Sequence, residues 1–336
     1  MNAQKVLKAI AAAAFGFAAA GTASAEVGEL KMMSQYGIGY MQLTLMKQEK
    51  LVEKHLAREG LPGTTVTWAR MAAGAAANDA LLSGSLHFAA GGTGPAIILW
   101  DRTRGNIGVH GVAALSSMPN LLVTRDARIK TIRDFTDKDR IAMAGAGSSV
   151  QTTYLQMAVA KEFGIENFKK LNPLMVNLPH PEGLRTMLSG SGEIQSTFPP
   201  PPFQTQALAN PGVRVVPNSY DVMGGPNTFL MVWATKKFRD ENPKTFRAVM
   251  AALREATDSI NADKRRAAEI YVKEGGGKDS AEKILAIMSD PQVHYKLAPD
   301  RILPYAQFMH QVGTLKNRPE SWKDLFFPDI HGEAGS

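Results

Sequence analysis

The sequence contains no cysteine among its 336 residues. Disulfide bonds, thiolate metal sites and cysteine nucleophiles are therefore excluded together, as is a lipid-anchored cysteine behind a leader peptide. Aromatic residues are scarce, at 7%. Beyond residue 25, no uninterrupted apolar run reaches the ~20 residues that a membrane-spanning helix needs. We therefore expect a protein that is not embedded in a membrane.

The signatures of metal, cofactor and nucleic-acid sites are also missing. The seven histidines show no paired spacing of the kind that binds zinc, so we expect no metal. Gly91–Pro95 lacks the third glycine of a dinucleotide fingerprint and the Gly-Lys-Ser/Thr of a phosphate-binding loop, so we expect no cofactor. The net charge of +7 favours encounter with anions. The basic residues are spread along the chain without interleaved aromatics, which argues against a nucleic-acid partner.

Residues 1–25 have the pattern of a secretory signal peptide. Lys5 and Lys8 form a short basic region, and the apolar run Ala9–Ala20 is too short to span a bilayer. Ala23–Ala25 is a small-x-small cleavage site. We therefore expect export and a free periplasmic protein; the alternative is a buried alanine-rich helix.

Strand-like and helix-like segments alternate through most of the chain, which predicts parallel sheets covered by helices. The strand-like segments are 29–34, 64–70, 86–90, 107–115, 120–125, 141–144, 174–178 and 228–235. The helix-like segments are 41–59, 72–83, 95–102, 150–163, 182–188, 243–262, 264–274, 280–289 and 299–312, followed by a polar tail at 320–332. The mature length exceeds that of a usual single core. We therefore expect an α/β protein of two lobes, each a mostly parallel sheet with helices on both faces, and a cleft between them.

A repeated segment supports two similar lobes. Leu82–Ser85 and Leu188–Ser191 both read Leu-Ser-Gly-Ser, both end a helix-like stretch, and both lead into a short strand and a rigid loop. The chain is expected to cross between the lobes near 117–124 and 220–230. Lobe 1 would then comprise 26–118 and 228–330, lobe 2 would comprise 119–227, and 331–336 would be a flexible tail.

The best local signal for a site lies at Ser148 and Ser149. Ser148 and Gln151 have the spacing of a capping box, directly after a strand and two glycines. The first N–H groups of a helix lack intrahelical partners and carry about half a positive charge, so this helix end is suited to an anionic head group. An ordinary strand-to-helix junction is the alternative.

Other candidate ligand-binding residues follow strands or lie at the first crossing. A loop that follows a strand often lines the cleft of an open α/β sheet. The alternative for each is plain turn chemistry or core packing, and we expect Phe198 with the following prolines to form an apolar wall. These candidates are Tyr36, Gly37, Tyr40, Gly92, Thr93, Gly94, Ser117, Asn120 and Phe198.

Five stretches carry a resemblance to the nitrate/sulfonate/taurine type of periplasmic solute-binding protein that serves ABC importers. They are NDALLSGSLHFAAGGTGPAI (78–97), GVAALSSMPNLLVTR (111–125), IAMAGAGSSVQTTYLQMA (141–158), GEIQSTFPPPPFQ (192–204) and NTFLMVWATKKF (227–238). Together they cover most of 34–238, while the C-terminal third matches only as a helical run. The motifs are loose one by one but specific in this order.

The resemblance implies the type II periplasmic-binding-protein fold, closing over a small organic anion and delivering it to a membrane permease. We expect such a protein to act as a monomer. The residues that match the family's contacts are Tyr36, Gly37, Thr93, Ser117, Ser148, Ser149 and Phe198. We expect a binding protein and not an enzyme, because the desulfinases and pyrimidine-forming enzymes that use this fold depend on cysteine. The alternatives are a binding component of a TRAP-type importer or a sensor, and a serine hydrolase or lyase using Ser148 or Ser149.

Overall fold

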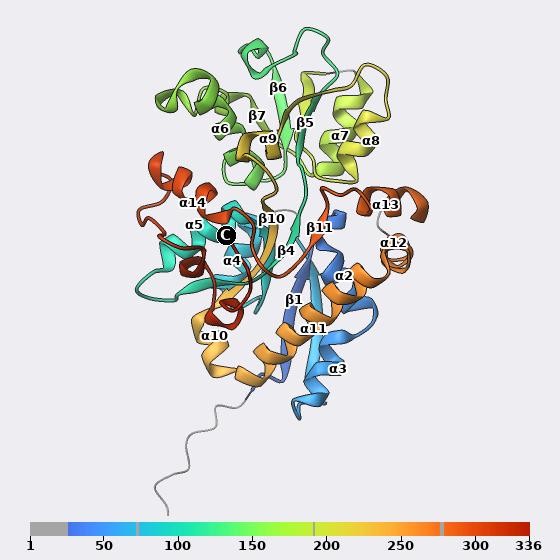
Figure 1. The fold of residues 1–336 in the computed structure, drawn as a ribbon, viewed down its shortest axis with the longest axis vertical. Helices are drawn as coiled ribbons and strands as arrows, with labels where there is room; N and C mark the ends of the chain where they lie inside the picture. Colours follow the sequence, from blue (N-terminus) through green and yellow to red (C-terminus); the bar gives the residue numbers. More distant parts are fainter. Residues whose placement is uncertain (1–25, 72–73, 191, 276–278) are drawn as a thin grey trace, which may run out of the picture.

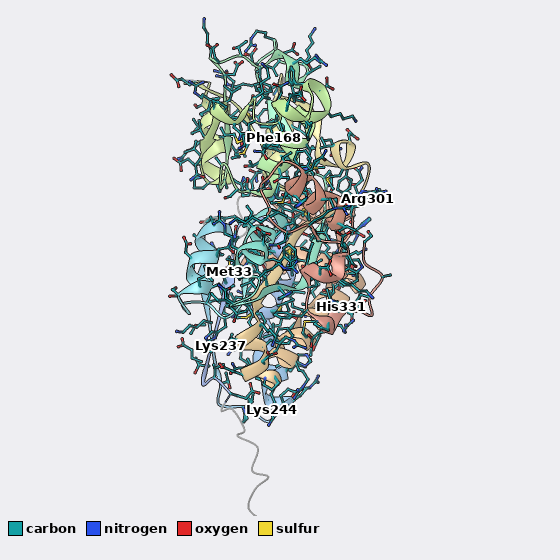
Figure 2. All side chains as sticks on the ribbon, turned by 90° about the vertical axis from the view of Figure 1, so that its left-hand side faces the viewer. Met33, Phe168, Lys237, Lys244, Arg301 and His331 are labelled. Atoms are coloured by element: carbon teal, nitrogen blue, oxygen red, sulfur yellow. The ribbon has the colours of Figure 1, made fainter. Side chains whose placement is uncertain are left out.

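The computed structural model describes residues 26–71, 74–190, 192–275 and 279–336, and it has two lobes stacked along its long axis (Figure 1). Viewed from the side, Phe168 lies in one lobe, Met33 and Lys244 lie in the other, and Arg301 lies near the waist (Figure 2). The two-lobed α/β fold predicted from the sequence is confirmed. The expected signal peptide, 1–25, lies outside the described residues.

Lobe 1 holds a two-stranded sheet and a four-stranded sheet, and lobe 2 holds one sheet of five strands. The strands of lobe 1 are β1 (Glu29–Ser34), β2 (Thr65–Arg70), β3 (Ala89–Gly92), β4 (Val109–Ser117), β10 (Thr228–Thr235) and β11 (His294–Tyr295). The strands of lobe 2 are β5 (Leu121–Thr124), β6 (Arg140–Met143), β7 (Met175–Asn177), β8 (Ile194–Thr197) and β9 (Arg214–Asn218). The orders are β1-β2, β11-β4-β10-β3 and β7-β6-β8-β5-β9.

The strand that follows each crossing runs opposite to its neighbours. β10 is antiparallel to β3 and β4, and β5 is antiparallel to β8 and β9. β1 and β2 are parallel, and β6 is parallel to β7 and β8. In the five-stranded sheet of lobe 2, β5 runs against the direction of the other four strands. In the four-stranded sheet of lobe 1, β10 and β11 both run opposite to β4, so all three ladders are antiparallel. β5 and β10 are reversed because a chain arriving from the other lobe enters the sheet at the cleft end, where the strands before the crossing finish.

Helices cover both sides of the sheets. In Figure 1, α4 and α5 lie on one side of the lobe 1 strands and α2, α3 and α11 on the other, while α6 lies opposite α7 and α8 in lobe 2. The helices of lobe 2 are α6 (Val150–Phe163), α7 (His180–Ser189), α8 (Phe203–Leu208) and α9 (Ser219–Met223). Those of lobe 1 are α2 (Met41–Gln48), α3 (Leu51–Arg58), α4 (Gly74–Leu82), α5 (Thr93–Thr103), α10 (Lys236–Glu241), α11 (Pro243–Ala262), α12 (Lys264–Lys273), α13 (Ala281–Met288) and α14 (Ile302–Gln311).

The described parts of the repeated segment, 82–85 and 188–190, occupy equivalent places in the two lobes. Gly84 follows α4 with φ 75°, and Gly190 follows α7 with φ 74°. This left-handed conformation is readily available to glycine and commonly ends a helix. The strands reached next, β3 and β8, each pair with the reversed strand of their own sheet. The sequence repeat therefore marks a structural repeat.

Three local predictions differ from the structure. The expected single helix over 41–59 is divided into α2 and α3 at Lys50, whose φ of 51° is left-handed and interrupts the helix. No loop separates β3 from α5, because the strand ends at Gly92 and the helix begins at Thr93. The short elements α8, β9, α9, α10 and β11 were not predicted.

The C-terminal segment, for which we expected a polar tail, packs against lobe 1. Trp322, Phe326 and Phe327 are buried. At the chain end, the Ser336 N–H donates to the Pro299 carbonyl oxygen (2.9 Å), and the Ser336 carbonyl oxygen accepts from Ile302 N–H (2.9 Å). Aromatic side chains spaced closely in a polar sequence are the signal that this segment is anchored.

The two crossings are hydrogen-bonded to each other. Asn120 follows β4, and Ser219 follows β9. The Ser219 N–H donates to the Asn120 carbonyl oxygen, and the Asn120 N–H donates to Ser219 Oγ, both at 2.9 Å. This pair of hydrogen bonds holds the two connections together.

Candidate functional site

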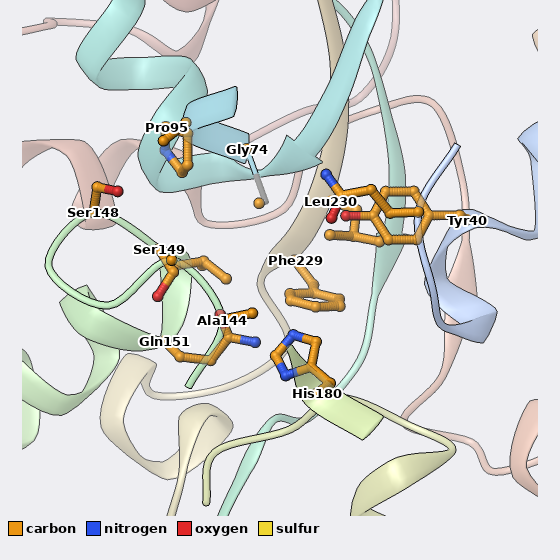
Figure 3. A pocket seen from close by; sticks show the side chains of 15 residues that line it. Tyr40, Gly74, Pro95, Ala144, Ser148, Ser149, Gln151, His180, Phe229 and Leu230 are labelled. Atoms are coloured by element: carbon orange, nitrogen blue, oxygen red, sulfur yellow. The ribbon is translucent and has the colours of Figure 1, made fainter. Parts of the chain in front are cut away.

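The candidate site is a pocket between the lobes where the N-termini of four helices converge (Figure 3). The helices α4 and α5 come from lobe 1, and α6 and α7 come from lobe 2. The residues that line it are Gln35, Tyr40, Gly74, Ala75, Gly92, Pro95, Ala144, Gly145, Ser148, Ser149, Val150, Gln151, His180, Phe229 and Leu230.

The N-terminus of α6 is prepared by a glycine turn. The N–H groups of Ser148 and Ser149 both donate to the Gly145 carbonyl oxygen, at 3.1 and 2.8 Å. Ser149 Oγ then accepts from the Thr152 N–H at 3.2 Å, so Ser149 is the N-cap. The spacing of Ser148 and Gln151 placed the cap one residue too early, because the turn after β6 takes up one more residue.

The N-terminus of α5 meets α6 across the cleft. Its N-cap is Gly92, without a side-chain cap. A Cβ on Gly92 would lie 2.9 Å from Val150 Cγ1, and a Cβ on Gly94 would lie 2.9 Å from the Ser148 carbonyl oxygen. Glycine at both positions therefore permits the backbone of one lobe to approach the other closely.

The electrostatics of the pocket come from neutral groups. None of its 15 lining residues is Asp, Glu, Lys or Arg. A helix N-terminus carries roughly half a positive charge and free N–H donors, so four of them favour an anion without a salt bridge. The negative ends lie away from the pocket, at the far ends of the helices.

The side chains in the pocket add further neutral donors. Burial raises the pKa of the Tyr40 hydroxyl well above its ordinary value, so this group stays protonated. Burial lowers the pKa of His180 from 6.5 to about 4, so its imidazole is neutral at pH 7. Both groups therefore present uncharged polar atoms to the cleft.

Gln151 connects the pocket to the crossings. It is buried, and its amide Nε2 donates to Asn120 Oδ1 at 3.2 Å. Asn120 in turn is held by Ser219. A group that contacts Gln151 in the pocket would thus be one residue away from the first crossing between the lobes.

The pocket leaves little free space between the lobes. Its cavity volume is about 30 Å³, which holds roughly one or two water molecules. Any ligand with several non-hydrogen atoms therefore requires the lobes to separate and close again around it, as in hinge motions of two-lobed proteins.

The structure brings only some of the predicted site residues together. Tyr40, Gly92, Ser148 and Ser149 line the pocket. The others lie around it.

Tyr36 and Gly37 line a neighbouring hollow, where Arg70 Cζ lies 5.0 Å from the centre of the Tyr36 ring. Gly37 also lies beside Pro200 and Pro201 of lobe 2, so the polyproline segment does reach the boundary between the lobes. Phe198, by contrast, is buried outside the pocket lining.

The remaining candidates serve the contact between the lobes and the crossings. Thr93 is buried behind the pocket. Gly94 lies against Ser148. Ser117 Oγ donates to Asp300 Oδ2 at 2.9 Å, and Asn120, which does not line the pocket, accepts a hydrogen bond from the lining residue Gln151.

Sequence reasoning missed His180, Phe229, Leu230, Gln35 and Gly74. His180 and Gly74 each begin a helix that follows a strand, and Gln35 directly follows β1. Ser148 was predicted because it lies where a strand leads into a helix, and the same reasoning could have identified these positions. Phe229 and Leu230 belong to β10, whose uniformly apolar sequence gives no sign of which residues face the cleft.

Two kinds of feature are absent from the described ranges. No helix there combines the length and apolar composition needed to cross a bilayer. Nor do His, Asp and Glu side chains form a group of three able to hold a metal ion within those ranges.

Comparison with known proteins gives one family and many similar folds. The sequence pattern of the NMT1-like family matches residues 25–272. The alkanesulfonate-binding protein SsuA from Xanthomonas axonopodis pv. citri, bound to MOPS, has a similar structure, with a TM-score of 0.67 at 19% identity over 88% of this chain and 96% of that one. No curated protein sequence matches the chain.

Two further solved structures show the same fold. The periplasmic aliphatic sulphonate binding protein SsuA from Escherichia coli has a TM-score of 0.64 at 18% identity, over 90% of this chain and 99% of that one. The periplasmic nitrate-binding protein NrtA from Synechocystis PCC 6803 has a TM-score of 0.65 at 16% identity, over 87% and 83%. Their shared architecture agrees with the two-lobed fold described above.

Proposed function

The chain belongs to the NMT1-like family, and from that premise we propose that it is the substrate-binding component of an ABC importer. It captures a small organic anion, such as a sulfonate or carboxylate, between its lobes. It then delivers the anion to the membrane permease. Neighbours of the same fold that bind alkanesulfonate or nitrate support this reading.

One observation carries the proposal: four helix N-termini meet in a pocket that contains no charged side chain. Such a pocket stabilises negative charge through N–H groups and helix dipoles. A cationic ligand would face the positive helix ends without a carboxylate to offset them. The pocket therefore favours an anion.

Closure is the step that links capture to delivery. We propose 26–118 with 228–330 as one rigid lobe and 119–227 as the other, moving about the crossings at Asn120 and Ser219. A closed pair of lobes presents a surface that the permease distinguishes from the open pair. This role places the protein in the periplasm, as a monomer, after removal of 1–25.

The geometry supports binding better than serine-dependent hydrolysis. Ser149 Oγ interacts with Thr152, accepting from its N–H and lying 3.1 Å from its hydroxyl. In the described structure, neither Ser148 nor Ser149 is hydrogen-bonded to a histidine or carboxylate that would act as a general base. Catalysis of that kind requires such a base within hydrogen-bonding reach.

The test is to identify and measure the ligand. The purified protein is denatured, and the small molecules it releases are analysed by mass spectrometry. The refolded, ligand-free protein is then titrated by calorimetry with methanesulfonate, acetate, nitrate and the released compound. Ligand at about 100 times its Kd should raise the free energy of unfolding by about 2.7 kcal/mol.

A carboxylate introduced at a helix N-cap inside the pocket, compared with one outside it, tests whether the ligand is an anion. Ser149→Asp should abolish anion binding, because it puts a negative charge at the α6 N-terminus in competition with the ligand. Ser280→Asp makes the same change at the N-cap of α13, outside the pocket, and should leave binding intact. A protein that binds none of the anions, or binds cations instead, contradicts the proposal.

A further inference from the structure

His180 is the one titratable side chain besides Tyr40 in the pocket lining. It is the first residue of α7, and its ring stacks on Phe203 of α8, with centroids 6.3 Å apart and planes inclined by 27°. Figure 3 shows the ring pointing into the pocket, beside Gln151 and Phe229. The stacking fixes the plane of the imidazole, so its two nitrogens have defined surroundings.

Those surroundings differ. Nδ1 is enclosed and has no hydrogen-bond partner in the described structure. Nε2 has no hydrogen bond to a described residue either, but it is not enclosed, and the ring is directed into the pocket (Figure 3). A neutral imidazole carries one proton, on the nitrogen that can best use it. An N–H at Nδ1 would be buried without an acceptor, which is costly.

The proton therefore belongs on Nε2. Burial also keeps the ring neutral, because it lowers the pKa of His180 to about 4 and so keeps a second proton off the ring at neutral pH. No charged group contributes to that shift, which arises from desolvation alone. The result is an N–H donor held rigidly, uncharged, and directed at the cleft.

We propose that His180 is a ligand-binding residue that donates a hydrogen bond from Nε2 to an oxygen of the bound anion. This rests on the proposed function and adds to it a specific atom and protonation state. Lobe 1 contributes the N–H groups of α4 and α5 and the Tyr40 hydroxyl. His180 supplies the corresponding side-chain donor from lobe 2, so an anion held by both sets draws the lobes together.

The protonation state is tested on the ligand-free protein. In protein labelled with ¹⁵N-histidine, long-range ¹H–¹⁵N spectra distinguish the two neutral tautomers from the charged ring, and the His180 signal is assigned by its loss in His180→Gln. We expect the neutral tautomer protonated at Nε2 at pH 7. A ring protonated at Nδ1, or a charged ring, overturns the inference whatever the ligand.

The contact is tested with methanesulfonate as the probe. His180→Phe keeps an aromatic ring against Phe203 but removes the donor, and its Kd should rise about 10- to 100-fold, as expected for a lost hydrogen bond to a charged group. His180→Gln restores a neutral N–H donor at a similar reach and should recover most of the affinity. His110→Phe alters a histidine of β4 outside the pocket and should leave the Kd unchanged.

The outcomes separate the two proposals. Binding by the wild-type protein with an unchanged Kd in His180→Phe overturns the role of His180 alone. Equal losses in His180→Phe and His180→Gln, with circular dichroism unchanged, also overturn it, because the donor would then not be what matters. No binding of methanesulfonate or any other small anion by the wild-type protein overturns the proposed function and this inference with it.

Discussion

Gly94 of α5 lies directly against the carbonyl oxygen of Ser148, across the cleft between the lobes: a Cβ on Gly94 would approach that oxygen to 2.9 Å. The obstacle is a backbone atom in a hydrogen-bonded turn, so it cannot move aside as a side chain would. Closure to the observed separation therefore depends on the absence of one methyl group.

Gly94→Ala should hinder closure without unfolding either lobe. Overpacking costs about 1–3 kcal/mol. The clash with Ser148 is relieved when the lobes part, whereas a second clash, 2.9 Å from the Tyr305 hydroxyl of lobe 1, remains in both states. The part that acts only in the closed state should raise the Kd for ligand about tenfold. Calorimetry measures the Kd, and small-angle scattering should give a larger radius of gyration with ligand present. Gly63→Ala, where a Cβ meets nothing within 4 Å, is the control. Unchanged affinity in Gly94→Ala would show that the contact is not needed.

Ser149→Ala should weaken both the fold and ligand binding. Loss of an N-cap hydroxyl costs about 1 kcal/mol, and here it also loosens the helix end that faces the ligand. Ser280→Ala removes the equivalent cap of α13 and should lower the free energy of unfolding similarly while leaving the Kd intact. Urea denaturation and calorimetry on both variants provide the comparison. Equal effects on the Kd would contradict a role for the α6 N-terminus.

Tyr154→Phe should destabilise the junction between lobe 2 and the second crossing. The Tyr154 hydroxyl accepts a hydrogen bond from Asn227 Nδ2, and both side chains are buried. Its removal leaves that amide donor without a partner, at a cost of about 1–3 kcal/mol. Urea denaturation measures the loss. Tyr220→Phe removes a hydroxyl that donates to the Gln292 carbonyl oxygen in a partly buried place, and it should cost less. An unchanged free energy of unfolding in Tyr154→Phe would show that this hydrogen bond does not stabilise the protein.

His180 should make stability depend on pH. Its pKa is lowered from 6.5 to about 4 by burial, so between these values the unfolded chain binds a proton that the folded chain does not. Stability therefore falls as the pH falls from about 6.5 to about 4, by roughly 2–3 kcal/mol from this group. His180→Phe should remove that part of the slope. The measurement is urea denaturation of both proteins from pH 7.5 to 4, and parallel curves would contradict the prediction.

Elements with strong local signals were predictable to the residue. α6 and β10 have their predicted bounds because a glycine turn with a cap starts the first and a run of apolar, β-branched and aromatic residues defines the second. β9 was not predictable in this way. Its residues are partly exposed, it contains Pro217, and its pairing with β5 joins segments far apart in the sequence.

The site shows the same division. A helix start after a strand can be recognised locally, so Ser149 was found, and the same rule applied more widely would have found His180. The sequence does not show how closely the two lobes approach each other. The close approach of Gly94 to Ser148 exists only because two lobes from different parts of the chain meet.

The reversed strand of lobe 1 also constrains the order in which the protein assembles. β10 is the strand that joins β3 to β4, and it lies after all of lobe 2 in the chain. When the chain emerges N-terminus first, all strands of the lobe 2 sheet are present before β10, which lies between β3 and β4. Lobe 1 therefore begins first in the sequence but completes its sheet last. Until β10 is added, the edges of β3 and β4 that pair with it are exposed to chaperones.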